Sequence, residues 1–151
     1  MQVTIDGLID REEVTQLRLG FAAYHDARDW DNLATLFAEE AVCDYPPALG
    51  GQWVGRSAIM QHIVRLNEGG VPYDALHIMT NPWISLQGAD FAKGRWYLTD
   101  FLTRQRPDFP SPGGHANPLV FLGVYHDEYR KIDGAWKFWR VKLDFYWPEH
   151  A

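Results

Sequence analysis

The segment Phe91-Ala-Lys-Gly-Arg-Trp-Tyr-Leu-Thr-Asp-Phe-Leu-Thr103 decides how the chain is interpreted, because its side chains alternate in character. Successive side chains of a strand point to opposite faces of the sheet. One face carries Ala92, Gly94, Trp96, Leu98, Asp100 and Leu102, all apolar apart from a single carboxyl group. An unpaired buried carboxylate is costly. We therefore expect Asp100 to point into an apolar interior and meet a polar partner there, unless it sits at a strand end in a purely structural role.

Around this segment, helical patterns come first and strand patterns follow. Leu17, Phe21 and Tyr24 recur at helical spacing and predict a helix over 12–27. Two shorter helices are expected over 30–37 and 58–67, with a short strand over 42–45 between them. The later strands are predicted over 75–79, 83–87, 91–103, 119–131 and 135–147. This order predicts an α+β fold in which N-terminal helices pack on one face of a mostly antiparallel sheet.

Composition narrows the class of protein. A chain of 151 residues with 46% hydrophobic content fits one globular domain over 1–151. The net charge of −6 argues against nucleic acid as a partner. The N-terminus has neither a basic leader nor a long apolar run, so we expect no signal peptide, no membrane span and a cytoplasmic location.

Four short sequence motifs, called landmarks below, follow one another along the chain. They are Tyr24-x-x-x-x-Asp29-Trp-Asp31 ahead of Leu36-Phe37, Gly51-x-Trp-x-Gly55, His77-x-x-Thr-Asn81, and Tyr125-x-Asp-Glu-Tyr129 ahead of Asp133-Gly-x-Trp136. With them, residues 12–147 resemble the SnoaL-like branch of the nuclear transport factor two-like superfamily. That branch includes scytalone dehydratase, bile-acid 7α-dehydratase and hexachlorocyclohexane dehydrochlorinase. The resemblance implies a cone-shaped α+β barrel, with a curved sheet wrapped on the N-terminal helices.

The resemblance also implies a catalytic set. It makes His77 a general base oriented by Asp29, and it adds Tyr24 and Asp100 as further catalytic groups. A neutral histidine can take a proton from carbon near pH 7, and a carboxylate on its other ring nitrogen fixes the tautomer. Tyr24 would donate to a developing negative charge, and Asp100 would protonate a departing hydroxyl or orient the substrate. Asp29 could instead serve only as the N-cap of the next helix.

Other side chains are expected to bind the substrate or to stay out of the site. The predicted substrate-binding residues are Arg140, Trp96, Tyr125 and Phe121. Arg140 could alternatively do no more than pair with Asp100. His25 is interpreted as a solvated helix residue. We expect no metal, since paired cysteines and a His-Glu-x-x-His motif are absent, and no nucleotide cofactor, since no glycine-rich phosphate loop follows a strand.

The expected function is a cofactor-independent lyase of the dehydratase or elimination type, acting on a small hydrophobic cyclic or aromatic molecule. One alternative is an isomerase of the ketosteroid type. Another is a non-catalytic ligand-binding or structural subunit, such as the β chain of a ring-hydroxylating dioxygenase.

The last strand carries the prediction about assembly. Trp139, Val141, Leu143 and Phe145 share one face at strict alternation, and an exposed apolar face of that kind favours a homo-oligomer, with a trimer preferred over a dimer. A bulge in this strand would exchange its two faces. The segment 104–118, rich in proline and glycine, is interpreted either as a lid over the site or as a solvated connector.

Overall fold

A computed structural model describes residues 3–102 and 119–147, and its longest helix is α1 (Ile5–Ala27). The Thr4 side chain caps this helix by accepting a hydrogen bond from the Gly7 backbone N–H at 3.1 Å. The helix begins earlier than the predicted residue 12, and its first two turns carry Ile5, Leu8 and Ile9 at helical spacing although these side chains are exposed. It ends where Arg28 adopts a left-handed conformation, with φ of 60°.

Two shorter helices and two strands build the end of the molecule that follows α1. They are α2 (Trp30–Thr35), β1 (Phe37–Asp44), β2 (Gln52–Val54) and α3 (Arg56–Leu66), with a 3-10 turn over Pro47–Leu49. The predicted helix over 30–37 is therefore too long at its C-terminal end, because Phe37 already pairs with β6. Strand β2 was not predicted, since three residues are too few to show alternation.

The remaining strands form the long meander that the sequence predicts. They are β3 (Ala75–Leu86), β4 (Phe91–Leu102), β5 (Leu119–Ile132) and β6 (Ala135–Trp147). The sheet has the order β2-β1-β6-β5-β4-β3, and every pairing is antiparallel except that of β1 with β6. The two predicted strands 75–79 and 83–87 are one strand with an irregularity between Thr80 and Trp83.

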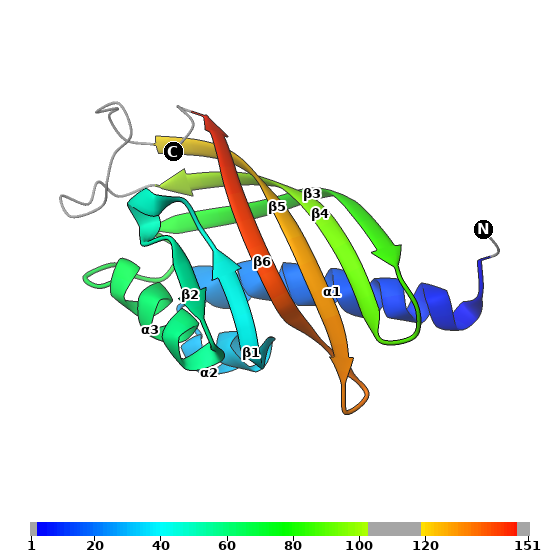
Figure 1. The fold of residues 1–151 in the computed structure, drawn as a ribbon. Helices are drawn as coiled ribbons and strands as arrows, with labels where there is room; N and C mark the ends of the chain where they lie inside the picture. The colour runs from blue at the N-terminus through cyan, green and yellow to red at the C-terminus, as the bar shows by residue number, and fades with distance from the viewer. Residues whose placement is uncertain (1–2, 103–118, 148–151) are drawn as a thin grey trace.

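Figure 1 shows the layers: the curved sheet wraps over α1, while α2 and α3 lie beside β1 and β2. Helix α1 packs against β3 and β6, and α3 packs against β1 and β2. The core lies between α1 and the inner face of the sheet, where Phe21, Trp96 and Phe138 are buried. This is the predicted α+β class with a mostly antiparallel curved sheet, so that expectation is confirmed. None of the helices within the described residues is long and apolar enough to cross a membrane.

A bulge in β6 overturns the predicted outer face of that strand. Glu128 pairs with Arg140 and the next residue, Tyr129, pairs with Phe138, so Trp139 falls out of step and the alternation reverses. Val141, Leu143 and Phe145, expected outside, are consequently buried in the core. Of the predicted interface, only Trp139 remains partly on the surface.

Exposed apolar side chains do gather on the outer face, but on the neighbouring strands. Leu76 and Ile78 of β3, Tyr97 of β4 and Leu122 of β5 are each between 39% and 45% exposed. The homo-oligomer, trimer before dimer, stays a prediction that now depends on these residues. The predicted lid over 104–118 lies outside the described residues.

Candidate active site

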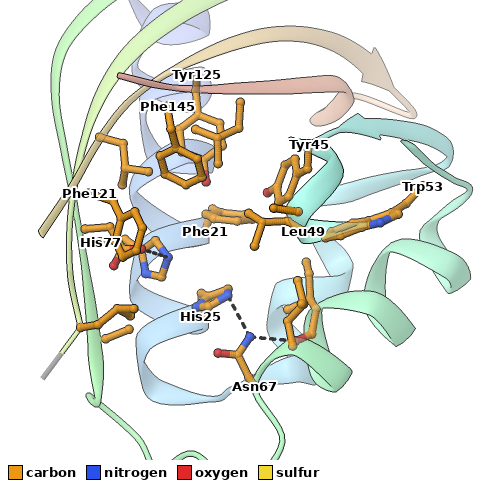
Figure 2. Close-up of a pocket in the computed structure, with 18 residues that line it drawn as sticks. Phe21, His25, Tyr45, Leu49, Trp53, Asn67, His77, Phe121, Tyr125 and Phe145 are labelled. Carbon is orange, nitrogen blue, oxygen red and sulfur yellow. Dashed lines mark hydrogen bonds and ion pairs between the residues drawn. The ribbon is translucent and has the colours of Figure 1, made fainter. Parts of the chain in front are cut away.

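A cavity lies at the end of the fold where α1 and α3 meet the inner face of the sheet (Figure 2). Its walls are largely aromatic and aliphatic side chains from α1, α3 and the sheet. A small number of polar side chains interrupts them: His25, Tyr45, Asn67, His77, Asp100 and Tyr125. A mostly apolar cavity with a few convergent polar groups is the usual form of a small-molecule site.

Asp100 and His77 are brought together by strand pairing. They are direct partners in the β3–β4 ladder and both point inward, so His77 Nε2 lies 3.9 Å from Asp100 Oδ2. Asp100 is 8% exposed, as the alternation in its strand predicts. Its other oxygen, Oδ1, is buried without a hydrogen-bond partner among the described residues. Burial raises the pKa of Asp100, against the opposing effect of His77.

The carboxylate that holds His77 is Asp26 and not the predicted Asp29. Asp26 Oδ1 lies 2.5 Å from His77 Nδ1, and Asp26 Oδ2 accepts the His77 backbone N–H at 3.0 Å. Asp29 instead caps α2, accepting from the Asn32 backbone N–H at 3.2 Å and from its amide Nδ2 at 2.7 Å. The reason is the left-handed Arg28, which ends α1 and turns Asp29 toward α2. The capping alternative is thus what Asp29 does.

The sequence gives no clear signal for Asp26, because this residue does not share the helical spacing of Leu17, Phe21 and Tyr24. The structure shows that Arg18 and Ala22 are also buried on α1, and Asp26 follows them at steps of four residues. Residues four apart lie above one another on a helix, so Asp26 lies on the side that faces the sheet, whereas Asp29 lies beyond the helix.

The surroundings of His77 favour its use as a base. Burial lowers its pKa, but the charge of Asp100 and the hydrogen bond and charge of Asp26 outweigh this, so the pKa is raised above its ordinary value. With Asp26 accepting from Nδ1, the hydrogen-bond network assigns the proton of neutral His77 to Nδ1 and the lone pair to Nε2. That lone pair lies on the Asp100 side of the ring, in a residue that lines the cavity.

Three other predicted site residues do not line the cavity. Tyr24 packs beside Leu36 over Gly20. Trp96 is buried elsewhere in the core, where its indole N–H donates to the Tyr129 hydroxyl at 3.1 Å. Arg140 is exposed on the outer face, because the β6 bulge turns it away, so it neither faces the cavity nor pairs with Asp100.

The two remaining predictions place their residues at the cavity. Phe121 and Tyr125 of β5 both line it (Figure 2). Tyr45, which was not predicted, lies near Tyr125, with ring centroids 6.5 Å apart. Burial raises the pKa of both phenols, so both remain protonated hydrogen-bond donors at neutral pH.

His25 is the residue that the sequence reading placed most wrongly. It was expected in solvent, yet it is 8% exposed and lines the cavity with its ring centroid 4.4 Å from that of His77. It stands four residues after Phe21, and this helical spacing from an apolar residue is the signal that could have identified it. Burial, together with the charges of His77 and Arg28, lowers the pKa of His25 well below its ordinary value.

A second buried ionic group lies behind the cavity wall. Arg18 donates to Asp127 through Nε at 3.0 Å and Nη2 at 2.5 Å, and Tyr129 donates to the same carboxylate at 2.7 Å. The guanidinium lies over the rings of Phe21 and Tyr125, at 4.8 and 4.0 Å from their centroids. These two rings also line the cavity. The ion pair therefore supports the wall without reaching the space inside.

One group of side chains within the described residues has donor atoms close enough to hold a metal ion. His25, Asp26 and His77 each offer one atom within 4.8 Å of the others. Asp26 Oδ1 already lies 2.5 Å from His77 Nδ1, and a metal bound between these two atoms would break that contact.

Comparison with known proteins identifies one family and several solved structures of similar fold. The family model described as a SnoaL-like domain matches residues 6–142. A solved protein of Novosphingobium aromaticivorans, provisionally named a scytalone dehydratase, is 24% identical over 95% of this chain and 88% of its own, with a TM-score of 0.72. A hexachlorocyclohexane dehydrochlorinase of Novosphingobium barchaimii is 19% identical over 95% and 90%, with a TM-score of 0.75. A cystatin-like protein of unknown function from Nostoc punctiforme is 20% identical over 99% and 98%, with a TM-score of 0.74.

Proposed function

The chain belongs to the SnoaL-like domain family, and on that premise we propose that it is a cofactor-independent lyase. Its substrate would be a small, hydrophobic, cyclic or aromatic molecule that loses water or halide. The observation that carries the proposal is the 2.5 Å contact between His77 Nδ1 and Asp26, which leaves Nε2 available beside the cavity.

In this reaction His77 Nε2 removes a proton from a carbon of the substrate. The electron pair of that C–H bond becomes a carbon–carbon double bond, and the leaving group departs from the neighbouring carbon with its own bonding pair. Asp26 stabilises the imidazolium that forms, as a carboxylate does beside a catalytic histidine. The short Nδ1–Oδ1 contact supports this role for Asp26.

Asp100 would donate a proton to the leaving group. Burial raises the pKa of this carboxyl, which favours the protonated form that can donate to a departing hydroxyl. Donation turns the hydroxyl into water. The 3.9 Å separation between Asp100 and His77 is longer than a hydrogen bond, so a water molecule passes the imidazolium proton on to Asp100. When halide leaves instead, Asp100 keeps its proton and the imidazolium proton is released to water. Either way the pair is reset without a cofactor.

The names of two similar structures, a scytalone dehydratase and a hexachlorocyclohexane dehydrochlorinase, agree with eliminations from cyclic molecules. We therefore suggest two probes for turnover: 3-hydroxycyclohexanone, which yields cyclohexenone and water, and hexachlorocyclohexane, which yields chloride. The apolar walls of the cavity suit both compounds.

The decisive comparison is between two aspartates that stand three residues apart. Asp26→Asn replaces the carboxylate that holds His77, and we expect it to reduce turnover by roughly 10²–10⁴-fold. Asp29→Asn is the matched control, because asparagine caps a helix as well as aspartate does, and it should leave turnover unchanged. Equal turnover of a converted probe by the wild type and Asp26→Asn would contradict the proposal.

An isomerase of the ketosteroid type is the second candidate. The observation that favours it is the proximity of two groups that exchange protons, His77 and Asp100, in a cavity that also holds the protonated phenols of Tyr45 and Tyr125. An isomerase would return the abstracted proton to another carbon of the same molecule. Release of water or chloride from a probe separates elimination from isomerisation, and a bound ligand without turnover would indicate the non-catalytic alternative.

A further inference from the structure

His25 has one engaged and one unengaged ring nitrogen within the described residues. Nε2 lies 3.4 Å from Asn67 Nδ2, whereas Nδ1 is buried and has no hydrogen-bond partner. Figure 2 shows His25 projecting from α1 between His77 and Asn67. A buried polar atom without a partner is costly, so its presence on a residue that lines the cavity calls for an explanation.

The orientation of Asn67 determines the direction of its hydrogen bond with His25. Arg28, which can only donate, contacts Asn67 Oδ1 through Nη1, so the amide oxygen is the atom that faces the guanidinium. Asn67 Nδ2 then carries two protons, and one of them goes to the Ile63 carbonyl at 2.8 Å. The other is directed to His25 Nε2, which must accept it.

Acceptance at Nε2 fixes the tautomer of the His25 ring. A neutral imidazole has one donor and one acceptor nitrogen. His25 is neutral at pH 7, because burial and the neighbouring charges of His77 and Arg28 lower its pKa. Its proton consequently lies on Nδ1, the nitrogen without a partner. The chain Arg28–Asn67–His25 thus holds a neutral N–H donor on a residue that lines the cavity, and nothing in the described residues accepts its proton.

We propose that His25 binds the substrate, donating a hydrogen bond from Nδ1 to a neutral oxygen acceptor such as a ring carbonyl. The inference rests on the proposed function and extends it by naming the feature of the substrate that is recognised. The cavity lining contains no lysine or arginine among the described residues, which fits an uncharged acceptor better than a carboxylate or a phosphate. His25 lies beside the proposed base, with the two ring centroids 4.4 Å apart. A carbonyl held there would be polarised next to the carbon that loses its proton.

The test uses two probes of the same shape, cyclohexanone and methylenecyclohexane, which differ only in the acceptor oxygen. Two-bond ¹⁵N–¹H correlation spectra should show wild-type His25 neutral at pH 7 with its proton on Nδ1. Cyclohexanone should move that proton's resonance downfield, and methylenecyclohexane should not. A proton on Nε2, or no downfield movement with bound cyclohexanone, would overturn the proposal.

The affinity of the two probes provides a second, independent measurement. In His25→Phe the preference for the ketone over the hydrocarbon should fall roughly fivefold, the value of one net hydrogen bond. His126→Phe on the outer face of β5 is the matched control and should retain the wild-type preference. An unchanged preference in His25→Phe overturns the proposal, and if that variant fails to fold, the wild-type spectra decide alone. Neither measurement involves turnover. A negative result for the His25 proposal can therefore be distinguished from an absence of the proposed lyase activity.

Discussion

The inner face of the sheet carries two buried carboxylates, Asp127 and Asp100, which differ in their hydrogen-bond partners. Asp127 receives two hydrogen bonds from Arg18 and one from Tyr129, so both of its oxygens have partners, although Arg18 Nη1 has none among the described residues. Asp100 has only His77 at 3.9 Å, and one of its oxygens has no partner among the described residues. A carboxylate whose two oxygens are both hydrogen-bonded to side chains stabilises a fold, whereas one with an unpaired oxygen beside a cavity keeps its capacity to bind and exchange protons. We therefore interpret Asp127 as structural and propose that Asp100 takes part in the chemistry.

The sharpest way to test this contrast is to remove the base. We expect His77→Gln to lower turnover by about 10²–10⁴-fold, the usual contribution of a general base, while the protein stays folded. Turnover of a converted probe and circular dichroism would be measured on the same preparation, with His126→Gln as a control on the outer face. Loss of the folded state, with no active folded fraction, would show that His77 belongs to the structural group.

Removing Arg18, which pairs with Asp127 behind the cavity wall, is expected to lower the stability of the fold. Arg18→Met leaves Asp127 buried without its cation, and breaking such a pair costs about 3–5 kcal/mol of the free energy of unfolding. Urea denaturation would measure the loss. The double variant Arg18→Met/Asp127→Leu is the control, because it removes both charges and should recover most of the stability. A single variant as stable as the wild type would contradict the structural assignment.

A change of pH dependence should follow from neutralising Asp26, the carboxylate that holds His77. The hydrogen bond and the charge of Asp26 help to raise the pKa of His77, whether or not Asp100 carries its proton. In Asp26→Asn that charge is removed, the pKa of His77 falls, and the rising limb of kcat/KM against pH should move to lower pH. Asp144→Asn, on the outer face, should leave the profile in place. Movement of the limb to higher pH would contradict the coupling.

The smallest expected effect is that of a chelator. Asp26 makes two hydrogen bonds to His77, and the proposed elimination needs no metal, so EDTA treatment followed by gel filtration should leave turnover unchanged. Loss of turnover, restored by Zn²⁺ but not by Mg²⁺, would instead make His25, Asp26 and His77 metal ligands.

Local patterns in the sequence determined the fold class and the inward position of Asp100. The alternation along 91–102 is sufficient to place Asp100 inside, because the period of a strand is a property of its own residues. The helical period of α1 likewise contains the inward position of His25, four residues after Phe21, although His25 was expected in solvent. Family landmarks added His77 and Tyr125, and Phe121, a further predicted substrate-binding residue, lines the same cavity.

Only the tertiary structure decided which groups are partners. Asp26 rather than Asp29 meets His77, because the left-handed Arg28 ends the helix between them and the β3 strand lies beside its last turn. Arg140 and the apolar side chains of β6 exchange faces at a single bulge, which strict alternation cannot reveal. The pairing of Arg18 with Asp127 spans 109 residues of sequence. Periodicity specifies the direction of a side chain, but a contact between distant segments depends on how those segments pack, and that is a property of the whole fold.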